Sequence, residues 1–205
     1  MTSIEIKIPV WLDLCIFWPA LLYRWARYGY PYRRIPLGEG RFAIVDPLIF
    51  YKLNKFHWTI DGRTDCFYAV RNVLTSRHSK CLRMHREIMK AKPGVIIDHR
   101  NINPLDNRIA NLRPATFTQN VHNRRKIRRK TSSRFIGPCL EKESNLFRVN
   151  IMHEGKRIYV GRFADEVEAA REYDRAALKY HGEFARLNFP REDYINEINN
   201  HSEAS

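Results

Sequence analysis

The sequence has few cysteines, and none of them belongs to a recognisable zinc-binding pattern. Its 205 residues include only Cys15, Cys66, Cys81 and Cys139, and no two of them form a C-x-x-C pair. A structural zinc site and a disulfide framework are therefore not expected. A reducing compartment suits such a chain best, and we expect a cytoplasmic protein.

A long uninterrupted hydrophobic run is also absent. The most apolar stretch, residues 8–23, is shorter than the ~20 residues of a membrane-spanning helix, and Asp13 and Pro19 interrupt it. Basic residues follow this stretch instead of preceding it, and no small-residue cleavage site appears, so a signal peptide is not expected. We expect residues 1–34 to form an aromatic-rich segment that packs on the protein or on a partner. Membrane attachment through residues 8–23 is the less favoured alternative.

Acidic residues are scarce, with 22 Asp and Glu against 36 Lys and Arg, and the net charge is +14. None occurs between Asp106 and Glu141, where a dense basic run is found instead. A surplus of this size favours a polyanionic partner, usually nucleic acid. We predict a basic linker at residues 126–133, either solvated or clamping DNA phosphates. The arginines in and beside it that we expect to contact DNA are Arg124, Arg125, Arg128 and Arg129.

Hydrophobic patterning predicts an α+β protein. In the first half, residues 40–46 and 66–73 are expected to be strands, and residues 47–58 a helix. Residues 80–89 continue the sheet or turn helical, which periodicity does not decide. In residues 92–98 a Pro-Gly turn and then a short apolar strand are predicted, followed by a loop, a second short strand at 111–113 and a helix at 116–126.

The last third predicts three strands, at residues 134–141, 146–152 and 156–163, followed by an amphipathic helix at 164–182. Strand alternation places apolar side chains of the second and third strands on the helix-facing side. The opposite face is then polar, basic and aromatic, as either a solvated surface or a DNA-reading surface requires. The side chains predicted on it are Arg148, Asn150, Arg157 and Tyr159.

Residues 98–120 contain the side chains that metal-assisted phosphodiester cleavage needs. Asp98 is a hard oxygen ligand suited to Mg²⁺ or Mn²⁺. His99, at the strand end, faces water if the strand breaks there, and can serve as a base. Asn120 on the following helix offers a second oxygen ligand, and Asn111 can fix the loop by bonding its backbone. Any one of these residues alone is more often turn chemistry.

The stretch "DHRNINPLDNRIANLR…TQN" resembles the HNH motif of homing-type endonucleases of phages and bacteria, a metal finger of two strands and a helix. The resemblance covers about residues 35–125. It implies His99 as general base, Asp98 and Asn120 as ligands of one divalent metal, and Asn111 as the central Asn that supports catalysis. His122 is a weaker candidate, and we expect a structural role for His85.

The loop departs from that family in one respect. Relatives often read Asp-His-Ile-Asn-Gly-Asn, whereas this chain has Arg100 and Ile102 in "DHRNIN". A glycine in place of Ile102 would have allowed a positive φ without strain. The expected ligands and base are nevertheless all present.

Residues 134–191 are similar to the Apetala-2, ethylene-response-factor type of DNA-binding domain, through "VGRF", "EAAREYDRAALKYHGE" and "LNFP". The resemblance implies that the outward residues of the second and third strands contact double-stranded DNA. With a polar tail at 192–205, the whole predicts a site-directed, strand-nicking DNA endonuclease of a bacterial or phage-infected cell. The alternative is a non-catalytic, sequence-specific DNA-binding protein with a degenerate HNH unit.

Overall fold

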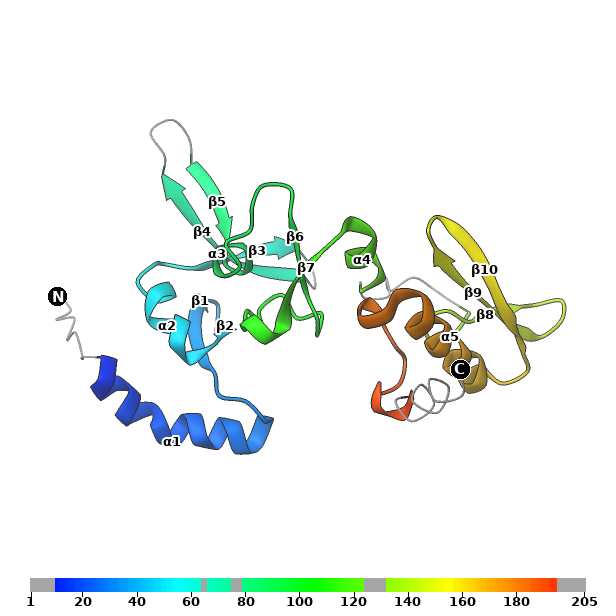
Figure 1. The fold of residues 1–205 in the computed structure, drawn as a ribbon, viewed down its shortest axis with the longest axis horizontal. Helices are drawn as coiled ribbons and strands as arrows, with labels where there is room; N and C mark the ends of the chain where they lie inside the picture. The colour runs from blue at the N-terminus through cyan, green and yellow to red at the C-terminus, as the bar shows by residue number, and fades with distance from the viewer. Residues whose placement is uncertain (1–9, 64–65, 75–78, 124–131, 195–205) are drawn as a thin grey trace, which may run out of the picture. The chain divides into compact units, whose positions relative to one another are not determined.

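The computed structural model describes residues 10–63, 66–74, 79–123 and 132–194 (Figure 1). The chain divides into two compact units, Met1–Pro114 and Ala115–Ser205, which are described separately below. The division falls inside the predicted nuclease domain at residues 35–125. The domain boundaries taken from the sequence therefore stay predictions.

The first unit begins with a helix that the sequence patterns did not predict. Helix α1 (Val10–Tyr28) contains Pro19 and leads into the first strand. The guanidinium of Arg33 lies 4.1 Å from the ring centre of Phe17 and 4.0 Å from that of Phe50, which ties the helix to the core. Among the residues described, no helix combines the length and the apolar character needed to cross a membrane.

Antiparallel strands make most of the first unit. The elements that follow α1 are β1 (Arg33–Gly38), β2 (Arg41–Val45), α2 (Pro47–Leu53), β3 (Thr59–Arg63), β4 (Cys66–Leu74), β5 (Ser79–Arg83) and α3 (Met84–Ile88). Strands β1 and β2 form a hairpin, and β3, β4 and β5 form a second sheet in that order. The predicted strands and the predicted helix are confirmed, although α2 ends earlier than expected, and the stretch at 80–89 is first strand and then helix.

Alternation along β1 and β2 supplies the core of this unit. The buried residues of the hairpin pack with α2, β4 and the indole of Trp58, whose Nε1 donates to the Leu53 carbonyl at 2.8 Å. The core residues are Ile35, Leu37, Ala43, Val45, Phe50, Leu53, Trp58, Ala69 and Met84. The hairpin is therefore a rigid base on which the following loop can be held.

Strand β6 (Ile96–His99) pairs with β7 (Leu112–Ala115), and a short 3₁₀ turn, η1 (Ile109–Asn111), precedes β7. The predicted second strand therefore starts one residue later than expected. The loop between β6 and β7 is hydrogen-bonded to β2 of the hairpin. The backbone N–H of Ile44 donates to the Leu105 carbonyl, and that of Asn107 donates to the Ile44 carbonyl. The predicted order of strand, loop, strand and helix is confirmed.

The second unit starts with α4 (Phe117–His122) and continues with β8 (Cys139–Glu141), β9 (Leu146–His153), β10 (Lys156–Phe163), α5 (Glu166–His181) and η2 (Gly182–Phe184). Strands β8, β9 and β10 form an antiparallel sheet with β9 in the centre, and α5 packs on β9 and β10 (Figure 1). The predicted sheet on one helix is confirmed, but the first strand is only three residues long, since residues 134–138 form a loop.

Helix ends in the second unit follow local side-chain chemistry. Thr116 and Gln119 form a capping box on α4, which ends sooner than the predicted 116–126. The side chain of Asp165 accepts from the backbone N–H of Glu168 at 2.7 Å and so caps the start of α5. Gly182, with φ 57°, ends α5.

A small-residue face lets α5 lie close to the sheet. Ala169, Ala170 and Ala177 of α5 are fully buried. Asp174 of the same helix is also buried, and its carboxylate accepts from the hydroxyl of Tyr194 at 2.9 Å. Tyr194 falls in the stretch predicted as a polar tail, yet it is 1% exposed, so the fold extends at least to that residue.

Candidate nuclease site and DNA-reading surface

The strand β6 ends in Asp98 and His99, which are 5% and 6% exposed. Asp98 is held by Arg113 of β7, whose Nε donates to Oδ2 at 2.9 Å and whose Nη2 lies 2.8 Å from the same oxygen. Arg113 was not among the predicted site residues. The pairing of β6 with β7 brings it to Asp98, and the arginine neutralises the buried carboxylate.

His99 lies in a small aromatic cluster. Its ring centre is 5.0 Å from that of His85 in an edge-to-face arrangement and 6.3 Å from that of Tyr68. His85, at the start of α3, is 4% exposed. Two imidazoles that lie far apart in the sequence are therefore neighbours in the fold.

Both imidazoles are held in their neutral form near pH 7. Burial lowers the pKa of His99, and the side chain of Asn107 and the carboxylates of Asp98 and Asp106 offset part of that lowering. Burial lowers the pKa of His85 to about 3, and the electrostatic interactions with His99, Arg83 and Arg86 act in the same direction. A neutral His99 is in the state that a general base requires.

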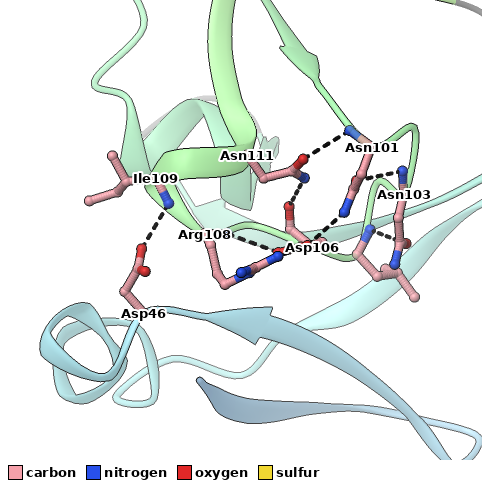
Figure 2. A network of polar contacts seen from close by, with 8 residues as sticks. Asp46, Asn101, Asn103, Asp106, Arg108, Ile109 and Asn111 are labelled. Carbon is pink, nitrogen blue, oxygen red and sulfur yellow. Dashed lines mark hydrogen bonds and ion pairs between the residues drawn. The ribbon is translucent and has the colours of Figure 1, made fainter. Parts of the chain in front are cut away.

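Asn111 fixes the loop that follows His99 (Figure 2). Its Oδ1 accepts from the backbone N–H of Asn101 at 2.9 Å, and its Nδ2 donates to the Asp106 carbonyl at 2.7 Å. Its own carbonyl accepts from the backbone N–H of Arg100. This geometry is the loop-holding arrangement expected for Asn111, while a role in catalysis stays a prediction.

Carboxylates complete the loop network. Asp106 accepts from Asn101 Nδ2 at 2.7 Å and from Arg108 through two guanidinium nitrogens, at 2.8 and 2.6 Å (Figure 2). Asp46, at the start of α2, uses its side chain to accept from the backbone N–H of Ile109 at 2.8 Å, not to cap the helix. The contacts of Asp106 therefore hold the loop together, and that of Asp46 ties it to the start of α2.

Ile102 adopts φ 62° in this loop. The sequence departs from the family's glycine here, yet the backbone keeps the left-handed conformation that glycine would allow. A β-branched residue in that region is strained by roughly 1–2 kcal/mol. The hydrogen-bond network around Asn111 holds the loop in this conformation despite the strain.

Asn120 is on α4 and belongs to the second unit. In that unit the ring of His122, the weaker candidate, stacks on that of His181 of α5, with 3.6 Å between centres. A role for His122 in the site stays a prediction. The joint action of Asn120 with Asp98 as metal ligands stays a prediction. Within the described ranges, no group of three or more His, Cys, Asp or Glu side chains is placed to hold a metal ion.

The donor chemistry of the predicted ligands nevertheless fits Mg²⁺ or Mn²⁺. These ions prefer oxygen ligands, and Mg²⁺ in particular uses one or two carboxylates together with water and substrate phosphates. Of the two predicted ligands, Asp98 has a carboxylate and Asn120 an amide oxygen, and their binding of one metal stays a prediction. A site of this kind does not need a third acidic residue.

The four predicted sheet residues lie on the face away from α5. In the register of β9 and β10, Asn150 is opposite Tyr159 and Met152 is opposite Arg157. Val149 and Ile151, which alternate with them, are buried, whereas Tyr159 is 58% exposed. The geometry is as alternation predicts, and contact of these residues with DNA stays a prediction.

Two more charged residues lie on this face and were missed. A bulge in β10 between Tyr159 and Gly161 places Arg162 opposite Arg148. Glu141 of β8 contacts both arginines, at 3.0 Å from Arg148 and 2.8 Å from Arg162. Hydrogen bonding to Arg162 and the positive charge of both arginines lower the pKa of Glu141. Gly161 was the sequence signal for the bulge, because glycine inside a strand often marks one.

The linker arginines cannot be placed in the same way. Arg124, Arg125, Arg128 and Arg129 lie outside the described residues, and so does most of the predicted linker at 126–133. Their contact with DNA therefore stays a prediction.

Comparison with known proteins agrees with both halves of this description. Residues 85–122 match the family model of the HNH endonuclease. Over 45 residues, 22% of this chain and 10% of the relative, the chain is 49% identical to an AP2-like ethylene-responsive transcription factor of Arabidopsis thaliana. It is 36% identical to the APETALA2-like protein 2 of Oryza sativa over 70 residues, 34% of this chain and 16% of that protein.

A further AP2-like ethylene-responsive transcription factor of Arabidopsis thaliana is 35% identical over 81 residues, 40% of this chain and 17% of the relative. The chain thus spans less than a fifth of each of these three curated relatives. The likeness concerns a domain and not the whole transcription factor. The two resemblances drawn from the sequence are confirmed: the chain joins an HNH endonuclease domain to a region similar to Apetala-2-type DNA-binding domains.

Proposed function

We propose that the chain is a metal-dependent, site-directed DNA endonuclease of the homing type that nicks one strand of a duplex. The observation that carries this proposal is the buried Asp98–His99 strand end, braced by the Asn111 loop, inside the segment that matches the HNH endonuclease family. In this proposal His99 is the general base and Asp98 and Asn120 are the metal ligands.

The site's own residues support hydrolysis in three ways. Burial keeps His99 neutral, so that its imidazole can take a proton from a water molecule. The hydrogen bonds of Asn111 hold the loop that follows His99. Mg²⁺ or Mn²⁺ bound by Asp98 and Asn120 would stabilise negative charge on the phosphate and on the leaving oxygen.

The second unit supplies the means to direct cleavage. Its sheet presents Arg148, Asn150, Arg157 and Tyr159 on one surface, and basic, amide and aromatic side chains are suited to reading base edges in a groove. Together with the +14 charge, this favours duplex DNA as the substrate. One site per chain favours a nick.

A second candidate function is sequence-specific DNA binding without cleavage. The observation that favours it is the ion pair between Arg113 and Asp98, because an arginine already neutralises the carboxylate that a metal would use. In this alternative the HNH unit only contacts DNA.

Conversion of supercoiled plasmid to open circle separates the two. The wild-type chain and His99→Ala are compared with Mg²⁺ or Mn²⁺, with a chelator control, alongside a DNA-binding assay. A nuclease gives open circles with the wild type only, and the chelator abolishes them. Retained DNA binding without conversion in either metal would establish the binding protein.

A further inference from the structure

His85 raises a question that the proposed function leaves open. Its side chain is almost completely buried, and its Nδ1 has no hydrogen-bond partner among the residues described. A buried polar atom without a partner is unfavourable, and a phenylalanine of similar shape would avoid that penalty. The packing of the fold does not explain why an imidazole is present.

The neighbour of His85 suggests what the nitrogen is for. The His85 and His99 rings lie 5.0 Å apart between centres, at an interplanar angle of 79°. The edge of one imidazole thus faces the other ring, and a hydrogen bond between the two requires one ring to turn. Tyr68, whose ring centre is 5.6 Å from that of His85, closes the cluster on another side.

A base acts well only when its ring is held in one orientation and one tautomer. The hydrogen bond made by one imidazole nitrogen determines whether the other carries a proton. A residue that bonds His99 from the protein interior would therefore control the nitrogen that faces the substrate water.

We infer that His85 is a positioning residue for His99, and that its imidazole nitrogen hydrogen-bonds the His99 ring when DNA is bound. This inference rests on the proposed nuclease function. It replaces the purely structural role that the sequence suggested for His85. His85 itself touches neither the phosphate nor the attacking water.

The test compares His85→Phe and His85→Asn with the wild type in plasmid nicking with Mn²⁺. The Phe variant keeps an aromatic ring without nitrogens, and the Asn variant restores a polar atom close to the Nδ1 position. We expect His85→Phe to lower kcat by about 10²-fold, with unchanged KM for plasmid and a thermal midpoint equal to or above that of the wild type. We expect His85→Asn to recover part of kcat.

The matched control is His57→Phe, the same substitution at an exposed position outside the site, with nicking expected at the wild-type rate. Wild-type nicking with an equally active His85→Phe variant would overturn the inference and leave the nuclease proposal intact. The inference is also overturned if the Phe variant loses thermal stability together with activity, because His85 would then be structural. If the wild type itself does not nick DNA, both proposals fail.

Discussion

Arg113 donates to the carboxylate of Asp98 at 2.9 Å, and their side chains are only 5% and 6% exposed. The two residues come from neighbouring strands and form a buried ion pair at the point where a metal is proposed to bind. Removal of one partner of such a pair leaves an uncompensated buried charge.

Arg113→Met is therefore expected to destabilise the chain by about 3–5 kcal/mol in the absence of metal. The free energy of unfolding from urea titrations measures this effect. If Asp98 is a metal ligand, Mn²⁺ should restore more stability to this variant than it adds to the wild type, since the carboxylate has lost its cation. The control is Arg27→Met on the exposed face of α1, expected to change stability by less than about 0.5 kcal/mol. Equal urea midpoints for wild type and Arg113→Met would contradict the prediction.

Asn111→Ala is expected to lower both stability and nicking. The substitution leaves the Asn101 N–H and the Asp106 carbonyl without the amide that bonds them, which costs about 1–3 kcal/mol. Urea denaturation and plasmid nicking report the two effects. Asn72→Ala, at an exposed position of β4, is the matched control. A stable Asn111→Ala variant would show that the loop is held by its other contacts.

Much of this organisation was accessible from the sequence because it is local. Residue patterns predicted the strands around Phe67 and Val149, and the helices expected at 116–126 and 164–182 begin within two residues of their predicted starts. The order of strand, loop, strand and helix in the HNH segment was predicted correctly because that segment is contiguous. Interactions between neighbours in sequence are those that a pattern can predict.

The rest depends on tertiary placement. Arg113 meets Asp98 only because β6 and β7 pair, and His85 at the start of α3 meets His99 at the end of β6 only through the fold. Alternation also failed at Arg162, since a bulge turns it to the outer face of the sheet. Pattern-based reasoning has no access to such long-range or irregular contacts.

The strained loop residue gives a prediction on stability. Because Ile102 has φ 62°, Ile102→Gly should be more stable than Ile102→Ala by about 1 kcal/mol. Both variants lack the isoleucine side chain beyond Cβ, so its loss largely cancels when the Gly variant is compared with the Ala variant. At Arg175, in the middle of α5, the order should be reversed, with Ala favoured over Gly by about 1 kcal/mol. Paired urea titrations of the four variants measure both differences, and an Ala variant at 102 as stable as the Gly variant would contradict the strain.

Glu141 gives a prediction on DNA binding. Its carboxylate contacts Arg148 and Arg162, so Glu141→Ala frees two guanidiniums on the proposed reading surface. Affinity for random duplex DNA should rise, and log Kd should depend more steeply on log salt, by about 0.9 for each added phosphate contact.

Salt titrations by fluorescence anisotropy measure that slope. Glu143→Ala removes the same charge from the exposed β8–β9 turn and should leave the slope unchanged. An identical slope for Glu141→Ala would mean that the sheet surface does not contact the phosphates.

The buried histidines predict a dependence of stability on pH. Burial lowers the pKa of His85 from 6.5 to about 3, so between these values the unfolded chain binds a proton that the folded chain does not. The free energy of unfolding is therefore unaffected by this group above pH 6.5. Below that pH it falls as the pH decreases, by up to about 1.4 kcal/mol per pH unit for each such group. His99, whose pKa is also lowered, adds to the same slope.

His85→Phe removes one of these two contributions. Its free energy of unfolding should fall less between pH 6.5 and 5 than that of the wild type, by up to about 1.4 kcal/mol per unit. Urea titrations at half-unit steps of pH measure the difference. An identical slope in both proteins would mean that His85 takes up its proton in the folded state as readily as in the unfolded chain. The claim that burial lowers the pKa of His85 and keeps the ring beside His99 neutral would then be wrong.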